Sequence, residues 1–367
     1  MKARFNREDM AEALLAVCSV TAARTPKQIL RCVKIEAMPD VILLSATDLE
    51  TSLRYAVTQV EVTAPGETVV VADTFSRIVR ECADELLSLE TSKNVLHIRG
   101  AGSHFQIVTQ SPEDFPPVAT MEEEADFRID QPVLRQMVEW TSFAAAREST
   151  RYAINGALWE LEGEMLALVA TDGRRLAWAK GKVNWRKPDG TVPQAIVPVK
   201  TMGLFGRLPD MAGAPVALKI TPNQFLLNMG RATLSSALVE GHFPEYRKVV
   251  PDDNNKFVDI NALELQSALR RAALLTNEES KAVRFSFGDA TLALSSRTPE
   301  QGEANITLPV RFKGEPLEIG FNPVFFLDVL RVSHTDEVSL SFKESNRPGV
   351  IRVGDDFLHV VMPVSLS

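Results

Sequence analysis

The sequence predicts an α+β protein that consists of three copies of one domain of about 120 residues, in a chain of 367. The first reason is a set of three landmarks that recur in the same order. They are an apolar residue before a helix cap (Phe5-Asn6, Ile129-Asp130, Ile260-Asn261), an Ala-Thr-Asp after a strand (46–48, 170–172), and a pair of residues before a proline (114–116, 242–244, 361–363). Ser296-Arg297-Thr298 stands where the third Ala-Thr-Asp would fall. Matched landmarks in order indicate a triplicated domain.

The second reason is the alternation of helical and strand patterns within each copy. A first helix is predicted after Asn6, Asp130 and Asn261, where apolar residues follow at helical spacing. Asp9 and Glu264 stand three residues after the asparagine caps, which is the capping-box position. A second helix is predicted from Asp73, from near Val199 and from Asn322, and strands are predicted at 41–44, 95–98 and 338–342. Two helices and more strands than helices in each copy define the α+β class.

The landmarks place the domains at residues 1–125, 126–251 and 252–367. A chain of this length exceeds what one hydrophobic core normally serves, so several domains are expected. The acidic run 122–124 and the polar run 251–256 fall where one copy ends and the next begins. We therefore interpret both runs as linkers.

The composition is that of an ordinary globular protein, with 45% apolar and 24% charged residues. The first six residues lack the apolar core of a signal peptide, and no stretch has the length of a spanning helix, so a cytoplasmic location is expected. Three cysteines and five scattered histidines give no metal-ligand spacing and no disulfide framework. We expect no metal and no cofactor.

The charge is unevenly distributed among the three copies, although the total is −8. Residues 1–125 hold 12 basic and 19 acidic residues, 126–251 hold 16 and 12, and 252–367 hold 12 and 17, for net charges of −7, +4 and −5. A protein that holds DNA by charge needs a positive face and not a positive total. The acidic total therefore does not exclude a nucleic-acid partner.

An enzyme would have to use Asp48 and Asp172 as paired carboxylates or metal ligands. Equivalent positions in successive copies are expected to lie about one domain apart, which is too far for shared acid and base chemistry. An aspartate that closes the turn after a strand is the simpler interpretation. The sequence also contains no phosphate-binding glycine loop and no nucleophile elbow, so catalysis is not indicated.

The whole chain resembles the β subunit of bacterial DNA polymerase III, the sliding clamp. The resemblance rests on Ala46-Thr47-Asp48-Leu49-Glu50, residues 151–156 and 170–177, Phe243-Pro244-Glu245-Tyr246-Arg247, residues 319–322 and residues 360–363, in this order and at these separations. It implies three clamp domains, each with two helices packed on antiparallel sheets, and a head-to-tail homodimer that closes a ring around duplex DNA. It also implies a non-catalytic processivity factor that tethers replicative and repair polymerases.

The resemblance implies DNA contacts that do not depend on base sequence, made by basic side chains on the helices and loops that line the ring. The DNA-binding candidates are Arg24, Arg77, Arg80, Arg135, Tyr152, Lys200 and Arg207, with Arg270, Arg271 and Arg331 as further lining residues. Asp73 stands where the family often has a basic residue, and Glu148 where an amide can occur. These two departures concern the path of the DNA and not the ring.

The resemblance also implies a hydrophobic cleft, between the second and third domains, that accepts a short peptide from polymerase subunits, the clamp loader and repair proteins. The pocket candidates are Ile154, Thr171, Gly173, Arg174, Arg175, Leu176, Pro244, Lys248, Val249, Phe325, Gly349, Val360, Met362, Pro363 and Val364. Aliphatic residues would hold leucine or phenylalanine anchors, and basic residues at the rim would meet acidic or amide groups. Ala153 and Val364 replace an aromatic residue and a methionine that are frequent in the family, so a pocket of different shape is expected.

The dimer interface implied by the resemblance uses Phe105 and Ile107 of the first copy, and Leu274 and Leu275 of the third. A head-to-tail contact of this kind closes after two subunits. The alternative function is a peptide-binding scaffold of three repeats that does not encircle DNA, which would explain the acidic total. Retention on circular DNA distinguishes the two.

Overall fold

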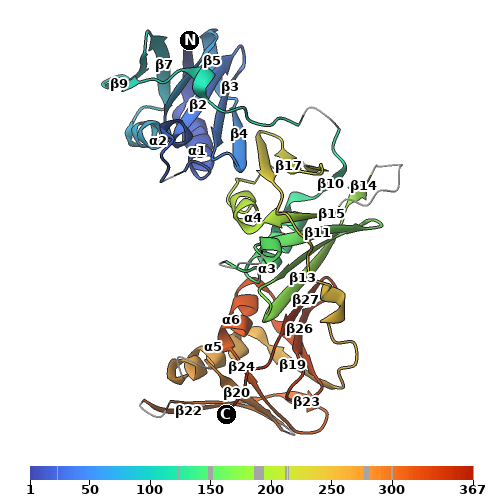
Figure 1. Ribbon diagram of the computed structural model, residues 1–367. Helices are drawn as coiled ribbons and strands as arrows, with labels where there is room; N and C mark the ends of the chain where they lie inside the picture. Colours follow the sequence, from blue (N-terminus) through green and yellow to red (C-terminus); the bar gives the residue numbers. More distant parts are fainter. Residues whose placement is uncertain are drawn as a thin grey trace. The chain divides into compact units, whose positions relative to one another are not determined.

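The computed structural model describes residues 1–22, 24–121, 124–147, 152–185, 194–210, 213, 215–276, 281–288, 290–298 and 301–366. The chain forms two compact units (Figure 1). Unit 1 contains residues 1–133, 183–193 and 200–238, and unit 2 contains residues 134–182, 194–199 and 239–367. The second copy of the repeat therefore contributes to both units.

Unit 1 contains two antiparallel sheets. The first has the order β5 (Val60–Ala64), β1 (Lys2–Asn6), β7 (Leu86–Ser92), β8 (Val95–Arg99), β9 (His104–Val108). The second has the order β14 (Asn184–Trp185), β10 (Phe127–Ile129), β16 (Val216–Ile220), β17 (Gln224–Met229), β18 (Ala232–Ala237), β4 (Thr51–Val57), β3 (Val41–Thr47), β2 (Cys32–Met38), β6 (Gly66–Val71). Helices α1 (Arg7–Cys18) and α2 (Ala72–Glu81) pack against each other, and α4 (Val199–Phe205) lies almost wholly in this unit.

Unit 2 also contains two antiparallel sheets. The larger has the order β15 (Gln194–Pro198), β11 (Gly156–Glu162), β12 (Met165–Thr171), β13 (Arg175–Lys182), β27 (Phe357–Val361), β26 (Gly349–Val353), β25 (Glu337–Phe342), β19 (Lys256–Asn261), β23 (Arg311–Lys313). The smaller has the order β22 (Gly302–Pro309), β21 (Thr291–Thr298), β20 (Val283–Phe287), β24 (Leu317–Phe321). Helices α5 (Ala262–Ala272) and α6 (Pro323–Val332) pack together, and most of α3 (Gln131–Ser142) belongs here.

The predicted helix caps are present at the asparagines. Asn6 Oδ1 accepts hydrogen bonds from the backbone N–H groups of Glu8 (3.0 Å) and Asp9 (3.1 Å), and Asn261 Oδ1 accepts one from Glu264 (3.0 Å). The capping box predicted for Asp9 is wrong. Its Oδ2 accepts from the backbone N–H groups of residues 58 and 59, and its Oδ1 pairs with Arg231. The Asn6 N–H that a capping box would use donates instead to the Gln59 carbonyl (2.9 Å).

Each large sheet crosses a boundary between copies of the repeat. In unit 1, β18 of the second copy pairs antiparallel with β4 of the first, and in unit 2, β13 of the second copy pairs antiparallel with β27 of the third. We call these the β4–β18 junction and the β13–β27 junction. Because ladder hydrogen bonds continue through both, neither copy ends at an unpaired strand edge there.

The cores are built from the buried residues of each strand, which alternate with more exposed ones, and from one buried stripe of each helix. In unit 2, Phe285, Phe321 and Phe326 are fully buried, with ring centroids about 5 Å apart. In unit 1, Phe5, Tyr55 and Phe75 are fully buried. Each such side chain contributes roughly 1.5–3 kcal/mol through removal of apolar surface from water.

Candidate partner-binding and DNA-binding sites

The turn between β12 and β13 begins the candidate partner site. Thr171 Oγ1 accepts a hydrogen bond from the Gly173 N–H (3.0 Å) and donates one to the Arg175 carbonyl (2.6 Å). Asp172 Oδ1 accepts from the N–H groups of Arg174 (2.9 Å) and Arg175 (3.1 Å). Gly173 has a φ of +86°, a conformation that favours glycine. Asp172 thus closes a turn, as the sequence indicated.

Arg175 is a largely enclosed structural residue of this turn, and its donors are used within unit 2. Its side chain is only 11% exposed, and its guanidinium bonds Asp172 Oδ2 (3.0 Å), Asp328 Oδ2 of α6 (2.7 Å) and the Phe143 carbonyl (2.7 Å). The guanidinium carbon also lies 4.6 Å from the centroid of the Phe325 ring. With its donors used internally, Arg175 holds α6 against the sheet, and of the two predicted arginines Arg174 is the exposed one.

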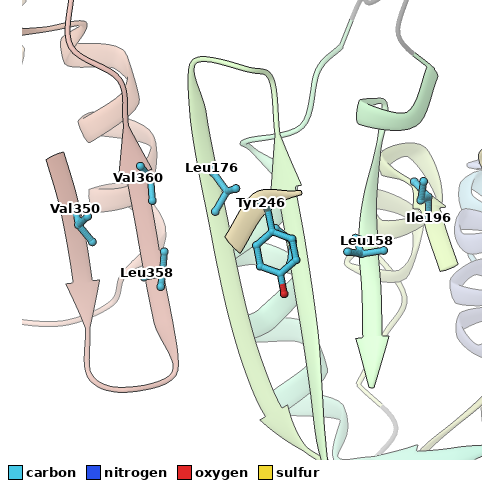
Figure 2. Close-up of a cluster of buried hydrophobic side chains, with 8 residues drawn as sticks. Leu158, Leu176, Ile196, Tyr246, Val350, Leu358 and Val360 are labelled. Atoms are coloured by element: carbon cyan, nitrogen blue, oxygen red, sulfur yellow. The ribbon is translucent and has the colours of Figure 1, made fainter. Parts of the chain in front are cut away.

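On the other face of the same strands, a cluster of buried apolar residues spans the β13–β27 junction (Figure 2). The junction cluster consists of Leu158, Val169, Leu176, Ile196, Tyr246, Val350, Leu358 and Val360. Ala153, Trp178, Val239, Phe243 and Val250 pack against it and remain partly exposed. The cluster is a continuous apolar surface, drawn from six strands and one short helix, that reaches the protein exterior.

Tyr246 covers this cluster from the short helix η4 (Tyr246–Lys248). Its hydroxyl donates to Glu160 Oε2 (3.0 Å), and Arg247 donates to the same carboxylate oxygen (2.8 Å). Burial, followed by the hydrogen bond to Glu160, raises the pKa of the Tyr246 hydroxyl above its usual value. The ring is therefore a fixed, neutral apolar cover with a polar edge.

The predicted pocket residues separate into two groups. Leu176 and Val360 pair across the junction within the cluster, and Met362, 37% exposed, donates its backbone N–H to the Arg174 carbonyl (2.9 Å). Pro244, Lys248 and Val249 flank Tyr246 in the chain and are exposed. Thr171 is buried at the start of the turn, Ile154 is buried at the end of the short helix Tyr152–Ile154, and Pro363 is partly exposed. These residues belong to the face that carries the junction cluster or to the chain segments that border it.

Three other predicted pocket residues contact further elements of unit 2. Phe325 lies against Arg175 on the helix side of the sheet. A side chain at Gly349 would point at the rings of Phe321 and Phe342, in the core of the third copy. Val364 donates its N–H to the Gly320 carbonyl (2.9 Å), which directs the C-terminal residues towards β24.

The sequence analysis did not select Tyr246, Val350, Leu358 or Trp178, which all belong to the apolar surface at the junction. Strand periodicity could have found two of them. Side chains two residues apart share a face, so Val360 implies Leu358, and Leu176 implies Trp178. Tyr246 lies inside the quoted run 243–247, but no periodic pattern marks its direction.

A buried histidine lies under the junction on its helix side. His359 in β27 is fully buried, pairs with Ala177 and packs its ring 5.3 Å from that of Phe143. Neither ring nitrogen makes a hydrogen bond of good geometry within the described part of the chain. Burial, and then the positive charge of Arg175, lowers the pKa of His359 to about 3. The imidazole is consequently neutral at physiological pH.

The DNA-binding candidates are distributed over loops and helices. Arg24 is exposed in the loop after α1, Arg77 and Arg80 are exposed on α2, Arg135 is partly exposed on α3, and Lys200 and Arg207 are exposed on and just after α4. Arg270, Arg271 and Arg331 are exposed near the ends of α5 and α6. The Tyr152 side chain and Glu148 lie outside the described residues.

Arg77 and Lys200 have carboxylate partners, and so does Arg331, whose Nη2 lies 3.3 Å from Asp328 Oδ1. Arg77 Nε lies 3.1 Å from Asp73 Oδ2, one turn earlier on α2, with both side chains exposed. Lys200 forms an ion pair with Asp48 Oδ2, and Asp48 Oδ1 accepts from the N–H groups of Glu50 and Thr51. Asp48 therefore closes the turn after β3, as Asp172 does after β12. An exposed pair such as Arg77–Asp73 contributes little to stability and exchanges readily for phosphate, whereas in the second pair Lys200 is 53% exposed and Asp48 only 11%.

The predicted interface residues lie at two different elements. Strand β9 is an edge strand, in which Phe105 is 36% exposed, Ile107 is buried and Val108 is 75% exposed. In unit 2, Leu274 is 76% exposed and Leu275 is partly buried, in the short helix Ala273–Leu275 that follows α5. An edge strand with exposed apolar side chains is suited to pairing with another chain.

Known proteins with similar sequences and structures contain the same three successive domains. Family models of the DNA polymerase III beta subunit match residues 1–120 (N-terminal domain), 128–245 (central domain) and 247–365 (C-terminal domain). The chain is 32% identical to the beta sliding clamps of Vibrio cholerae and Escherichia coli K12, over all of each chain. The crystal structure of the DNA polymerase III subunit beta from Pseudomonas aeruginosa matches with a TM-score of 0.93 at 32% identity, and that of the Bacillus subtilis clamp with 0.94 at 26%, each covering both chains completely.

Three successive clamp domains over nearly the whole chain define a DNA sliding clamp, which is a processivity factor and not an enzyme. The chain belongs to the DNA polymerase III beta subunit family. Among the described residues, none of the helices combines the length and apolar character needed to cross a bilayer, and His, Cys, Asp and Glu side chains form no group of three suited to a metal ion.

Proposed function

We propose that two copies of this chain associate head to tail into a ring that encircles duplex DNA and tethers polymerases to it in the cytoplasm. The observation that carries the proposal is the triplicated clamp domain, with two helices per copy and exposed arginines or lysines on or next to them. We place the domain boundaries at 1–125, 126–251 and 252–367. A closed ring stays on DNA by topology, so each phosphate contact can remain weak and exchangeable.

The DNA contacts in this proposal come from Arg24, Arg77, Arg80, Arg135, Tyr152, Lys200 and Arg207. Lys200 exchanges Asp48 for a backbone phosphate when DNA enters the ring, and Arg77 does the same with Asp73. The Arg77–Asp73 pair is exposed on both sides, which supports a low energetic cost for its exchange, and Lys200 is 53% exposed although its partner Asp48 is only 11% exposed. None of these contacts reads base identity, and binding is expected to fall steeply with salt.

Ring closure in this proposal pairs the first copy of one chain with the third copy of the other. The exposed edge strand β9, with Phe105 and Ile107, would meet the segment of Leu274 and Leu275 in the partner chain. Main-chain pairing at a strand edge supplies register, and the exposed leucine supplies apolar area. Such a heterologous contact closes after two subunits.

Partner proteins would bind at the β13–β27 junction through a short peptide. The junction cluster supplies the apolar surface, Met362 and Val249 its adaptable exposed side chains, and Arg174 and Lys248 its positive rim. A peptide with aliphatic or aromatic anchors and an acidic or amide neighbour fits that chemistry.

Topological retention tests the function. The chain is loaded onto a nicked circular plasmid by a clamp loader, isolated by gel filtration, and measured before and after the plasmid is linearised. We expect retention on the circle and release from the linear form. Protein that stays bound after the cut would be held by affinity, which would contradict encirclement. A scaffold that does not encircle DNA, the alternative function, would show no retention on the circle.

A further inference from the structure

The β4–β18 junction reproduces the backbone plan of the β13–β27 junction. Thr47 Oγ1 accepts from the Leu49 N–H (3.0 Å) and donates to the Thr51 carbonyl (3.1 Å), as Thr171 does with residues 173 and 175. The Ala237 N–H donates to the Glu50 carbonyl (2.8 Å), as the Met362 N–H does to Arg174. Residues 52 and 235 pair across the junction, as residues 176 and 360 do in unit 2.

At the first junction these equivalent positions line an open groove of about 610 Å³. Ser52 and Ser235, whose hydroxyls are 2.5 Å apart, form its floor where unit 2 has Leu176 and Val360. Its walls come from Leu49 and from the segment 116–119, which follows the same landmark as residues 244–247. The volume is within the usual range for sites that bind peptides and small molecules.

The groove differs from the partner site in charge. Glu50 is the one ionisable residue among the described residues that line it, and it is exposed. Its structural equivalent in unit 2 is the exposed cation Arg174. Glu113 and Asp114, also exposed and acidic, lie three and two residues before Pro116, the first residue of the wall segment. A ligand that carries phosphate or carboxylate is therefore disfavoured.

The polar atoms of the groove suit a peptide backbone. Asn223 and Gln224 line one side, and their carboxamides make no hydrogen bonds with other described residues. Together they offer donors and acceptors to an extended main chain. The serine floor accommodates small or hydroxyl-bearing side chains, while Leu49 and Val118 offer apolar contact.

We propose that the groove at the β4–β18 junction is a second peptide-binding site, specific for an extended segment that carries one lysine or arginine between small or aliphatic residues. The basic side chain pairs with Glu50. The peptide class rests on the function proposed for the β13–β27 junction, whereas the groove, its lining and its charge do not. A clamp with two sites of opposite charge preference could hold two classes of partner on one chain.

Fluorescence polarisation of the full chain tests the proposal. The probes are two labelled pools of capped octapeptides, with lysine or glutamate fixed at the fourth position and alanine, serine, valine, leucine or proline elsewhere. We expect the lysine pool to bind more tightly than the glutamate pool to chains whose partner site is disabled by Leu176→Ala with Met362→Ala. In that background Glu50→Lys should weaken lysine-pool binding about tenfold, the effect of one charge-assisted hydrogen bond.

The controls use exposed positions, so that each variant is expected to fold. Ala237→Trp fills the groove and should abolish lysine-pool binding, whereas Glu61→Lys makes the same charge change on β5, outside the lining, and should leave it unchanged. Absence of saturable lysine-pool binding, or binding that survives Ala237→Trp, would overturn the second site. If wild-type binding were lost on disabling the partner site, the groove proposal would fail while the partner-site proposal would stand.

Discussion

The β4–β18 and β13–β27 junctions share one backbone arrangement and differ in the side chains that cover it. In unit 2 the junction cluster runs without a break from β15 to β26 under Tyr246. In unit 1 the corresponding apolar cluster of Cys32, Val69 and Phe115 stops at β2 and β6, and the groove begins where it ends. The comparison teaches that the repeat fixes hydrogen bonds and register, while a few side chains decide whether a junction is filled, open, acidic or basic.

The two turns show how conserved backbone chemistry supports this divergence. Asp48 and Asp172 each accept two backbone N–H groups in the same positions. Asp172 also binds Arg175, whereas the equivalent of Arg175 is Thr51, and Asp48 binds Lys200 instead. The unit 2 junction is therefore tied to α6 by a buried guanidinium, and the unit 1 junction has no equivalent tie at Thr51 among the described residues.

The largest expected difference between the junctions comes from Arg175→Ala. Its removal leaves Asp172 and the Phe143 carbonyl without their partner and should destabilise unit 2 by about 3 kcal/mol. Urea unfolding followed by tryptophan fluorescence reports chiefly on unit 2, which contains Trp140, Trp159 and Trp178 of the four tryptophans. Lys180→Ala, which breaks a 3.7 Å surface pair with Asp356, should cost less than about 0.5 kcal/mol. Equal costs for the two variants would show that Arg175 is not the structural tie.

A second difference is the response of the two junctions to pH. His359 is equivalent to Leu234, which is fully buried in unit 1. The unfolded chain binds a proton at this residue near pH 6.5, whereas the folded chain does so near pH 3. The unfolded state therefore holds more protons between these values, so the contribution to stability is complete above pH 6.5 and is lost as the pH falls towards 3.

The His359→Leu variant tests this pH response by placing the unit 1 residue in unit 2. The stability of the wild type relative to the variant should fall by up to about 1.4 kcal/mol per pH unit between pH 6 and pH 4. Denaturant unfolding at several pH values measures it, with Leu234→Met as a volume-matched control in unit 1. Parallel pH profiles for wild type and His359→Leu would contradict the assignment of a neutral buried imidazole.

A peptide with leucine and phenylalanine anchors should bind at the β13–β27 junction and not at the β4–β18 groove. Leu176→Ala with Met362→Ala removes apolar contact area and should weaken that peptide about tenfold, equivalent to about 1.4 kcal/mol. Fluorescence polarisation measures the affinity, and retention on circular DNA checks that the ring is intact. Ala237→Trp should leave this affinity unchanged. An unaltered affinity in the double variant would disprove the partner-site assignment.

Much of the fold could be predicted from the sequence because the triplication repeats short-range signals. Asn6, Asn261 and Asn322 cap helices as their sequence context indicated, since a cap depends on neighbours two or three residues away. The joining of β4 to β18 and of β13 to β27 was not predicted. Strand pairing between residues about 180 positions apart leaves no local pattern in the sequence.

The sequence indicated which chain segments form the candidate site, but not which side of the sheet each side chain lies on. Arg174, Arg175, Leu176, Val360 and Met362 were selected, and residues 174–176 meet residues 360–362 across the β13–β27 junction. The opposite directions of Arg175 and Leu176 follow from the strand period, but the sequence could not show that Asp328 of α6 would claim the guanidinium. The groove in unit 1 was missed because serine and alanine at a junction give no sequence signal for an open space.

The smallest expected effects test whether the two turns are equivalent in backbone energetics. Leu49 has a φ of +82°, close to the +86° of Gly173, and a side chain there strains the backbone by roughly 1 kcal/mol. Leu49→Gly should therefore stabilise unit 1 by up to about 1 kcal/mol, and Gly173→Ala should destabilise unit 2 by about the same amount, although its new Cβ would meet no atom within 4 Å. Differential scanning calorimetry of both variants measures the shifts. If backbone strain is the cause, the two variants must change the stability in opposite directions. A loss of stability in Leu49→Gly would mean that packing of the leucine side chain in the groove contributes more than its backbone conformation costs.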